Sequence, residues 1–342
     1  MSCDVISEPH KPATTDRLCC LHIGMPKTAT KTMQMSLFAQ HQEVDYLGTY
    51  TGAGRKYFRQ CRTPGIQQLM SELIWDRIKT PDLDAARILY QEEVAPSLAN
   101  GKVPVWSWES LMENRPEVQR QRAENLRAVF GPCKIIATLR HPITLIESLY
   151  LQLLKRDNVG GYSGFGKPMR YQPIDRWIDD QWDAIGDAPK AHLEYANTIE
   201  TFADVFGKEN VGVFLFEQLT TNPQAYYEGI CNFIGIDPQE AMSHVGETRK
   251  NERWTDTQLE RLDSIHRSLW KSTLFRFSPR VTRRKMLGLP GNTRGIPPQG
   301  SRGATLSIAP HLAKKIQDKT REGNRHLQEQ WGLPMEDFQY PV

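Results

Sequence analysis

The chain has 342 residues, 39% of them hydrophobic and 24% charged, so it can bury a large core and is not expected to be disordered. Its 43 basic and 40 acidic residues leave a formal net charge of +3, which argues against a nucleic-acid-binding protein. No uninterrupted apolar run approaches the ~20 residues needed to span a membrane. Residues 1–17 are polar and lack the apolar stretch of a secretory signal, so we expect a flexible arm on a cytoplasmic protein.

Five short runs of apolar and β-branched residues are typical of buried parallel strands. They cover residues 18–23, 44–47, 103–108, 134–139 and 211–216. Helical patterns lie between them or follow them, over residues 30–41, 143–156, 195–206 and 224–234. Strands that alternate with helices predict an α/β fold of three layers, with a mainly parallel central sheet flanked by helices.

Two segments interrupt this alternation. Residues 158–166 are rich in glycine and predict a loop. Residues 277–306 contain several basic residues, prolines and glycines but no acid, and we expect a long basic loop rather than a helix. After it, residues 309–330 have the pattern of a closing amphipathic helix.

The cysteines and histidines show no metal-binding spacing. The six cysteines form no C-x-x-C pair, and the nine histidines form no H-E-x-x-H motif. Cys19 and Cys20 are adjacent, so on a strand they would point to opposite faces and could not easily bridge to each other. We therefore expect reduced, mostly buried thiols and no metal site.

The segment 18–38, LCCLHIGMPKTATKTMQMSLF, combines a buried strand, a tight turn and the start of a helix. The first N–H groups of a helix are unpaired, and the helix dipole favours negative charge there. The same stretch supplies ammonium and hydroxyl groups, from Lys27, Thr28, Thr30, Lys31 and Thr32. This junction therefore predicts a phosphate or sulfate site.

The nucleotide-triphosphate loop, G-x-x-x-x-G-K-[ST], is the obvious comparison. If Lys31 and Thr32 supplied its last pair, its glycines would fall on Met25 and Thr30, so the match fails at both. In such enzymes a neighbouring strand ends in an Asp that holds Mg²⁺. Here the strand over 134–139 ends at Arg140, a cation that attracts phosphate and repels a metal ion. The pattern indicates an anionic nucleotide bound without a metal.

That combination resembles the sulfotransferases that use 3′-phosphoadenosine 5′-phosphosulfate (PAPS). Their P-K-[TS]-[GA]-[TS]-[TS] turn binds the 5′-phosphosulfate, and residues 26–31, PKTATK, match it except at Lys31, where a second Thr is common. The match includes Ala29 at the small-residue position. Their second motif, a strand ending in Arg with a Ser eight residues later, holds the 3′-phosphate, and Arg140 and Ser148 reproduce it.

The resemblance covers about residues 18–237, including a weaker similarity over 207–235. It implies a P-loop NTPase-like sulfotransferase fold, with PAPS as the donor and the desulfated nucleotide, PAP, as the product. It also implies a single domain over 18–342, with a nucleotide-binding core at about 18–237 and an acceptor region at about 238–342. Arg302 and Gly303 are candidates for the family's late segment that closes over the 3′-phosphate.

The chemistry of sulfuryl transfer suggests two catalytic residues. Negative charge grows on the bridging oxygen of the leaving phosphate, and the ammonium of Lys27 is placed to reach it. The acceptor, a hydroxyl or an amine, needs a base. Glu109 directly follows the strand over 103–108. Its Ser-x-Glu context resembles the one found in bacterial members of this sulfotransferase family. The alternative is that Glu109 is a carboxylate favoured by the dipole at a helix start.

The acceptor cannot be read from these motifs, and carbohydrate, lipid and small metabolite are all compatible with them. Trp177 and Trp182 either line the acceptor cleft or belong to the core. Two other functions fit parts of the pattern: a P-loop-type kinase or nucleotidase, and a non-catalytic protein that binds PAP or PAPS. We expect no nucleic-acid partner, and the pattern leaves the oligomeric state open.

Overall fold

The computed structural model describes residues 17–49, 61–74, 80–112, 116–159, 171–183, 193–245, 254–289, 304 and 306–342. Contacts group the chain into two compact units, Met1–Arg140 with Tyr195–Thr248 and His141–Glu194 with Arg249–Val342. No helix within the described ranges is long and apolar enough to cross a membrane. The expected N-terminal arm lies outside these ranges up to residue 16, as does most of the glycine-rich segment 158–166. The single domain expected over 18–342 stays a prediction.

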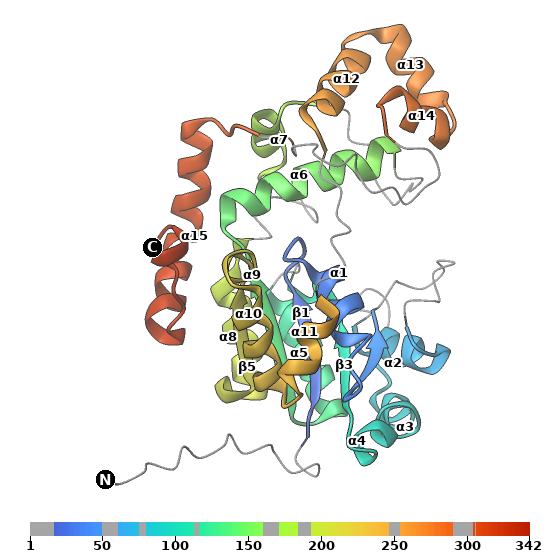
Figure 1. Ribbon diagram of the computed structural model, residues 1–342, viewed down its shortest axis with the longest axis vertical. Helices are drawn as coiled ribbons and strands as arrows, with labels where there is room; N and C mark the ends of the chain where they lie inside the picture. The colour runs from blue at the N-terminus through green and yellow to red at the C-terminus, as the bar shows by residue number, and fades with distance from the viewer. Residues whose placement is uncertain are drawn as a thin grey trace. The chain divides into compact units, whose positions relative to one another are not determined.

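The first unit is built on a parallel sheet of five strands in the order β2-β3-β1-β4-β5. Figure 1 shows β1, β3 and β5 among the helices of this unit. All five expected strands are present: β1 (Cys19–Gly24), β2 (Val44–Gly48), β3 (Val103–Ser107), β4 (Cys133–Leu139) and β5 (Val211–Leu215). In the centre, Cys20 of β1 lies opposite Val105 of β3 and Lys134 of β4. The strands are mainly apolar because a parallel sheet is buried on both faces. The predicted α/β class is confirmed.

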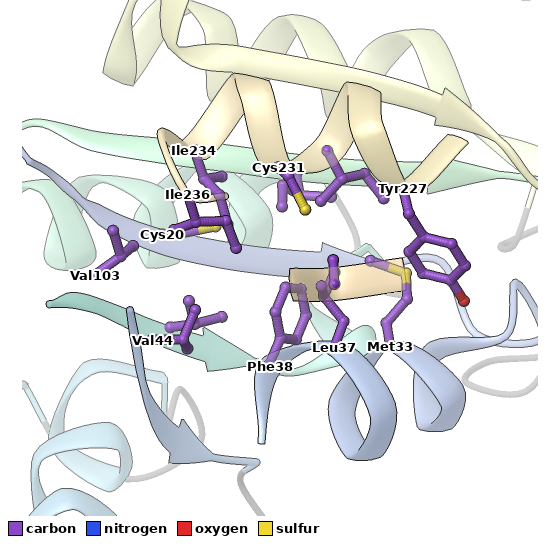
Figure 2. Close-up of a cluster of buried hydrophobic side chains, with 14 of the residues drawn as sticks. Cys20, Met33, Leu37, Phe38, Val44, Val103, Tyr227, Cys231, Ile234 and Ile236 are labelled. Carbon is purple, nitrogen blue, oxygen red and sulfur yellow. The ribbon is translucent and has the colours of Figure 1, made fainter. Parts of the chain in front are cut away.

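One face of the sheet carries the helices that follow β1 and β5. The chain leaves β1 through a short α-helical turn, α1 (Thr30–Thr32), which continues as a π-helix, η2 (Met33–Phe38). It packs beside α10 (Pro223–Ile234) and α11 (Pro238–Val245) over a buried cluster that includes Cys20, Leu37 and Cys231 (Figure 2). Deep burial of this cluster holds the start of α1 against the sheet, and thereby places the turn that precedes it.

Leu21 and Ile23 alternate with Cys20 and point to the opposite face. There α8 (Tyr195–Phe206) contacts β4 and β5, and α5 (Pro116–Phe130) packs on α8. Three more helices fill the connection from β2 to β3: α2 (Pro64–Ile74), α3 (Leu83–Glu93) and α4 (Ala95–Ala99). The predicted helix layers on both faces are therefore present.

The second unit is helical within the described residues. It contains α6 (Pro142–Val159), α7 (Ile174–Gln181), α12 (Asp256–Arg267), α13 (Leu269–Phe277), α14 (Arg280–Met286) and α15 (Pro310–Trp331), of which α14 and α15 contact α6. Trp177 is buried beside the ring of Tyr150, with ring centroids 5.5 Å apart, and Trp182 is buried beneath the ammonium of Lys315. Both tryptophans therefore belong to the core of this unit.

The expectation of a loop over 277–306 is wrong for its first part, because Arg280–Met286 forms α14. The helix begins directly after Pro279, a residue that ends the preceding helix but is compatible with the start of a new one. Leu287 and Leu289, just beyond α14, are buried and tie the segment to the unit. Burial of these leucines outweighs the mutual repulsion of the cations that suggested a loop. Residues 290–303 lie outside the described part of the chain.

Candidate functional site

Gly24 ends β1 at a place where only glycine fits. Its φ of +111° lies in a region that other residues rarely adopt, and a Cβ here would stand 2.5 Å from the carbonyl oxygen of Glu109. The Met25 N–H donates to the carbonyl of Thr138 on β4, over 2.8 Å. The missing side chain lets the backbone of Glu109 pack directly against the start of the turn.

The turn itself contains two left-handed residues that are not glycine. Lys27 has a φ of 69° and Ala29 a φ of 63°, each a conformation that costs an L-residue about 1–2 kcal/mol. Such strain persists only where the surrounding structure imposes it, and it gathers at functional sites. Directly after it, α1 begins at Thr30, and the Thr32 N–H already donates to the Ala29 carbonyl over 2.8 Å. The first N–H groups of a helix have no earlier carbonyl to bond within it, which leaves those of Thr30 and Lys31 as candidate donors to an anion. The turn thereby brings these donors and Lys27, whose charge acts on the carboxyl of Glu109, to the same end of the sheet.

The two junctions predicted to bind phosphate lie next to each other. β1 and β4 are neighbours, yet the chain leaves β1 toward β2 at one edge of the sheet and leaves β4 toward β5 at the other. Open α/β sheets bind ligands beyond the strand ends at such a switch point. Arg140, which follows β4, donates from Nη1 to the carbonyl of Lys27 over 2.9 Å. The turn and the arginine thus form one cationic site.

Further contacts hold Arg140 in this position. Its guanidinium carbon lies 4.7 Å from the centre of the Phe216 ring, a cation–π contact at the end of β5. Its carbonyl accepts a hydrogen bond from the Tyr195 hydroxyl over 2.8 Å. Phe216 and Tyr195 did not stand out in the sequence as site residues, because an aromatic residue after a strand or at a helix start is most often core.

Glu109 lies in the same site and begins the 3₁₀-helix η3 (Glu109–Met112). Burial raises the pKa of its carboxyl above the ordinary glutamate value. A hydrogen bond with Thr30 and the nearby charges of Lys27 and Lys31 oppose that rise in pKa. The structure therefore brings together four of the predicted residues, Lys27, Thr30, Lys31 and Glu109.

The hydroxyl of Thr28 points into the protein, although we expected it to face the anion. Thr28 is fully buried, and its Oγ1 donates to the carbonyl of Met25 over 2.6 Å and lies 2.6 Å from Thr138 Oγ1. The reason is the tight turn, which folds the side chain back under its own backbone. Thr28 supports the turn from below.

Thr28 belongs to a series of buried hydrogen bonds that crosses the sheet. From Thr138 on β4 the series continues to His22 on β1, to Ser107 on β3 and to Gln34 on η2. The three successive distances between hydrogen-bonding atoms are 3.5, 2.7 and 2.9 Å. Each of the three strands contributes one polar residue near its carboxyl end. That repeated position was a signal in the sequence, where His22, Ser107 and Thr138 interrupt otherwise apolar runs.

The groups at the two ends of this series of hydrogen bonds set the direction in which its members donate. Gln34 donates from its amide nitrogen to Ser107, and at the other end the Met25 carbonyl can only accept. Every hydroxyl between them has one proton, so Ser107 donates to Nδ1 of His22, and Nε2 of His22 carries the proton toward Thr138. Complete burial lowers the pKa of His22 to about 3, so the imidazole is neutral.

We expect the acid sensitivity of the fold to decrease in the variant His22→Gln. An unfolded histidine binds a proton near pH 6.5, whereas folded His22 stays neutral down to about pH 3. Between these values the proton binds the unfolded chain alone, so His22 lowers the free energy of unfolding as pH falls, by about 1.4 kcal/mol per pH unit. Denaturant titrations from neutral to acid pH should show a shallower decline for the variant. Unchanged slopes, equal to those of the exposed-site control His311→Gln, would contradict a neutral His22.

The remaining predicted residues are placed as follows. Thr32 is partly buried on α1, and Ser148 is partly buried on α6, in the second unit. Arg302 and Gly303 lie outside the described residues. In the described part of the chain, no three or more His, Cys, Asp or Glu side chains are grouped so as to hold a metal ion. Of the six cysteines, the five that the structure describes are buried and form no disulfide.

The arrangement suits the binding of an anion and a proton transfer beside it. Lys27, Lys31 and Arg140 concentrate positive charge at the end of the sheet, and the carboxyl of Glu109 stands next to them with a raised pKa. No family model matches the sequence, and no curated protein matches it.

Solved structures that are similar to the chain include the following three. A sulfotransferase from Alicyclobacillus acidocaldarius has a TM-score of 0.44 and 15% identity, over 80% of this chain and 97% of that one. The sulfotransferase domain of the Synechococcus PCC 7002 olefin synthase has a TM-score of 0.35 and 16% identity, over 71% of this chain and 82% of that one. A sulfotransferase domain from the curacin biosynthetic pathway has a TM-score of 0.34 and 16% identity, over 65% of this chain and 75% of that one.

Proposed function

We propose that this protein is a sulfotransferase that moves the sulfuryl group of PAPS to a hydroxyl or amine acceptor without a metal ion. The observation that carries the proposal is the meeting of the turn after β1 with Arg140, whose Nη1 lies 2.9 Å from the Lys27 carbonyl. A donor with phosphate groups at two positions of its ribose needs two cationic subsites a short distance apart. The turn supplies one for the phosphosulfate and Arg140 supplies the other for the 3′-phosphate.

Lys27 and Glu109 have complementary roles in this reaction. The bond between sulfur and the bridging oxygen breaks, and a bond forms between sulfur and the acceptor oxygen or nitrogen. Lys27 stabilises the negative charge that grows on the leaving phosphate. Glu109 accepts the proton that the acceptor loses. A carboxyl whose pKa is raised by burial is a stronger base than an exposed one, and the charges of Lys27 and Lys31 still favour its ionised form.

A transfer assay separates this function from its alternatives. The chain is incubated with ³⁵S-labelled PAPS and a library of hydroxyl and amine acceptors, with and without EDTA. Transfer of label that survives EDTA supports the proposal. A kinase or nucleotidase would instead act on ATP only in the presence of Mg²⁺, and a non-catalytic protein would bind PAP tightly without transferring label. Either of these results would overturn the proposal.

The variant Arg140→Ala is expected to bind PAP about ten to a hundred times more weakly, because it loses a charge-assisted contact with the 3′-phosphate. Binding of AMP, which lacks that phosphate, should fall less. It should still fall to some extent, because Arg140 also holds the Lys27 carbonyl. Calorimetry with both nucleotides measures the difference. Equal losses would mean that Arg140 acts only by supporting the turn.

A further inference from the structure

The second unit exposes an apolar helix face that its own fold does not cover. On α13, Leu269 is 90% exposed, Trp270 66%, Leu274 54% and Phe277 80%. Trp270, Leu274 and Phe277 recur at the spacing of a single helix face. Phe275 points the other way, is buried, and contacts the ring of His266 with ring centroids 6.0 Å apart. One side of α13 is thus anchored in the unit while the other presents large apolar side chains.

Cations border this apolar face. Lys271 follows Trp270 and Arg276 precedes Phe277, so the two project on either side of the face. The neighbouring helix α14 adds Arg280 and Lys285, both exposed, and an exposed Val281. No Asp or Glu occurs between Asp263 and Asp318. We call Trp270, Leu274, Phe277, Lys271, Arg276 and Arg280 the α13–α14 surface.

We propose that the α13–α14 surface binds the protein to the surface of an anionic phospholipid bilayer. Interfacial helices have this composition: aromatic and aliphatic side chains enter the boundary between headgroups and acyl chains, while Lys and Arg at the flanks reach the lipid phosphates. The membrane is bound peripherally, since no helix in the described ranges can span it. This inference goes beyond the proposed function, and it does not depend on sulfuryl transfer.

The cations and the apolar side chains of the α13–α14 surface together favour an anionic bilayer over other partners. A purely polyanionic partner would account for the cations and leave the exposed tryptophan, leucines and phenylalanine without a role. A second copy related by a two-fold axis would bring the same cations opposite each other, and like charges at an interface oppose association. A bilayer with anionic headgroups is complementary to both features at once.

Sedimentation of the full chain with vesicles tests the proposal. The probes are vesicles of phosphatidylcholine alone and of phosphatidylcholine with phosphatidylglycerol as the minor component. We expect binding to the anionic vesicles only, and a weaker binding at high salt. The double variant Trp270→Ser with Phe277→Ser should bind at least about tenfold more weakly. Arg276→Glu and Arg280→Glu, each of which changes the charge by two, should each weaken vesicle binding by about thirtyfold.

Matched controls change exposed residues elsewhere. Ile88→Ser removes an exposed apolar side chain on α3, where Ile88 is 60% exposed, and Arg325→Glu reverses an exposed charge on α15. Both should bind vesicles as the wild type does. Trp270→Phe should keep vesicle binding but lose the quenching of tryptophan fluorescence by brominated lipid. Circular dichroism confirms that each variant is folded.

Several results would overturn the proposal. Equal binding to neutral and anionic vesicles would remove the role of the cations, and unchanged binding by the Trp270→Ser, Phe277→Ser variant would remove that of the apolar face. Absence of vesicle binding, together with a dimer that this variant dissociates, would assign the surface to an interface between copies. Binding of a single-stranded oligonucleotide in preference to vesicles would assign it to nucleic acid. Because sedimentation measures binding and not turnover, each outcome is independent of the sulfotransferase assay.

Discussion

The variant Lys27→Ala is expected to lose about a hundredfold to a thousandfold in kcat while folding as the wild type does. Lys27 lies in the turn between β1 and α1, and its backbone carbonyl accepts a hydrogen bond from Arg140. In the proposed reaction its ammonium stabilises the charge that grows on the leaving phosphate. Stability should be preserved, because Ala and Lys pay the same cost at a φ of 69°. Steady-state measurement of label transfer from PAPS gives kcat, a single-turnover measurement isolates the transfer step, and thermal unfolding checks the fold.

The pH of that comparison matters, because Lys27 also acts on Glu109. Its charge lowers the pKa of the Glu109 carboxyl, so its removal shifts the acid limb of the activity profile to higher pH. The wild type and the variant should therefore be compared where both activity profiles are flat. The matched control is Lys31→Ala, on the exposed first turn of α1, which should affect KM more than kcat. If Lys31→Ala abolished turnover and Lys27→Ala did not, the role assigned to Lys27 would belong to Lys31.

The variant Glu109→Gln is expected to change activity and stability in opposite directions. Loss of the base should lower kcat by about a hundredfold to ten-thousandfold. The free energy of unfolding at neutral pH should rise, because the raised pKa means that the fold disfavours the ionised carboxyl. Gln keeps an oxygen that can accept the hydrogen bond from Thr30. Activity assays and denaturant titrations on the same preparation measure both effects.

The pH dependence of the gain in stability identifies its cause. Below the ordinary glutamate pKa the carboxyl is protonated in both the folded and the unfolded chain, so wild type and variant should differ little. The gain should develop as pH rises through that value toward the raised pKa of the folded protein. In the wild type, kcat/KM should fall as pH drops through the raised pKa of Glu109, because the base becomes protonated.

A second carboxylate at a helix start serves as the control. Glu117 is exposed in the first turn of α5, where the helix dipole favours its charge, so Glu117→Gln should lose about 0.3–1 kcal/mol of stability and no activity. If Glu109→Gln were destabilised in the same way and kept its turnover, Glu109 would be a helix-start carboxylate only. The sign of the change in stability therefore separates the two interpretations of Glu109.

Much of the fold could be predicted because its sheet is parallel. Strands buried on both faces are continuous apolar runs, and β1 to β5 all stand out as such. The helices that cover them were harder to recognise. Between β2 and β3 we predicted no helix, yet α2, α3 and α4 form there. A signal for α2 is present, since apolar residues recur at 66, 69, 70, 73 and 74, the spacing of one helix face. Packing of α2 and α3 against α5, and of α4 against β3, then buries these helices.

Local features of the sequence were enough to predict the chemistry of the candidate site. A strand, a Pro-Lys turn and a helix start together predict an anion site, and Arg140 after a second strand adds a cation in place of a metal-binding acid. These are local features, encoded by neighbouring residues. They also indicated Glu109, through its place at the end of a strand.

Which of these groups meet, and what supports them, depends on contacts between elements that are far apart in the sequence. The strand order places β1 beside β4, and this alone brings Arg140 to the Lys27 carbonyl. The glycine at position 24 admits Glu109 through a contact more than 80 residues away in sequence. The series of hydrogen bonds from Gln34 through His22 to Thr28 joins four elements in the same way. It holds the hydroxyl of Thr28, which we predicted to face the ligand, inside the protein. Such contacts depend on the register of strands distant in sequence, which is set by burial of the whole sheet and not by any local pattern.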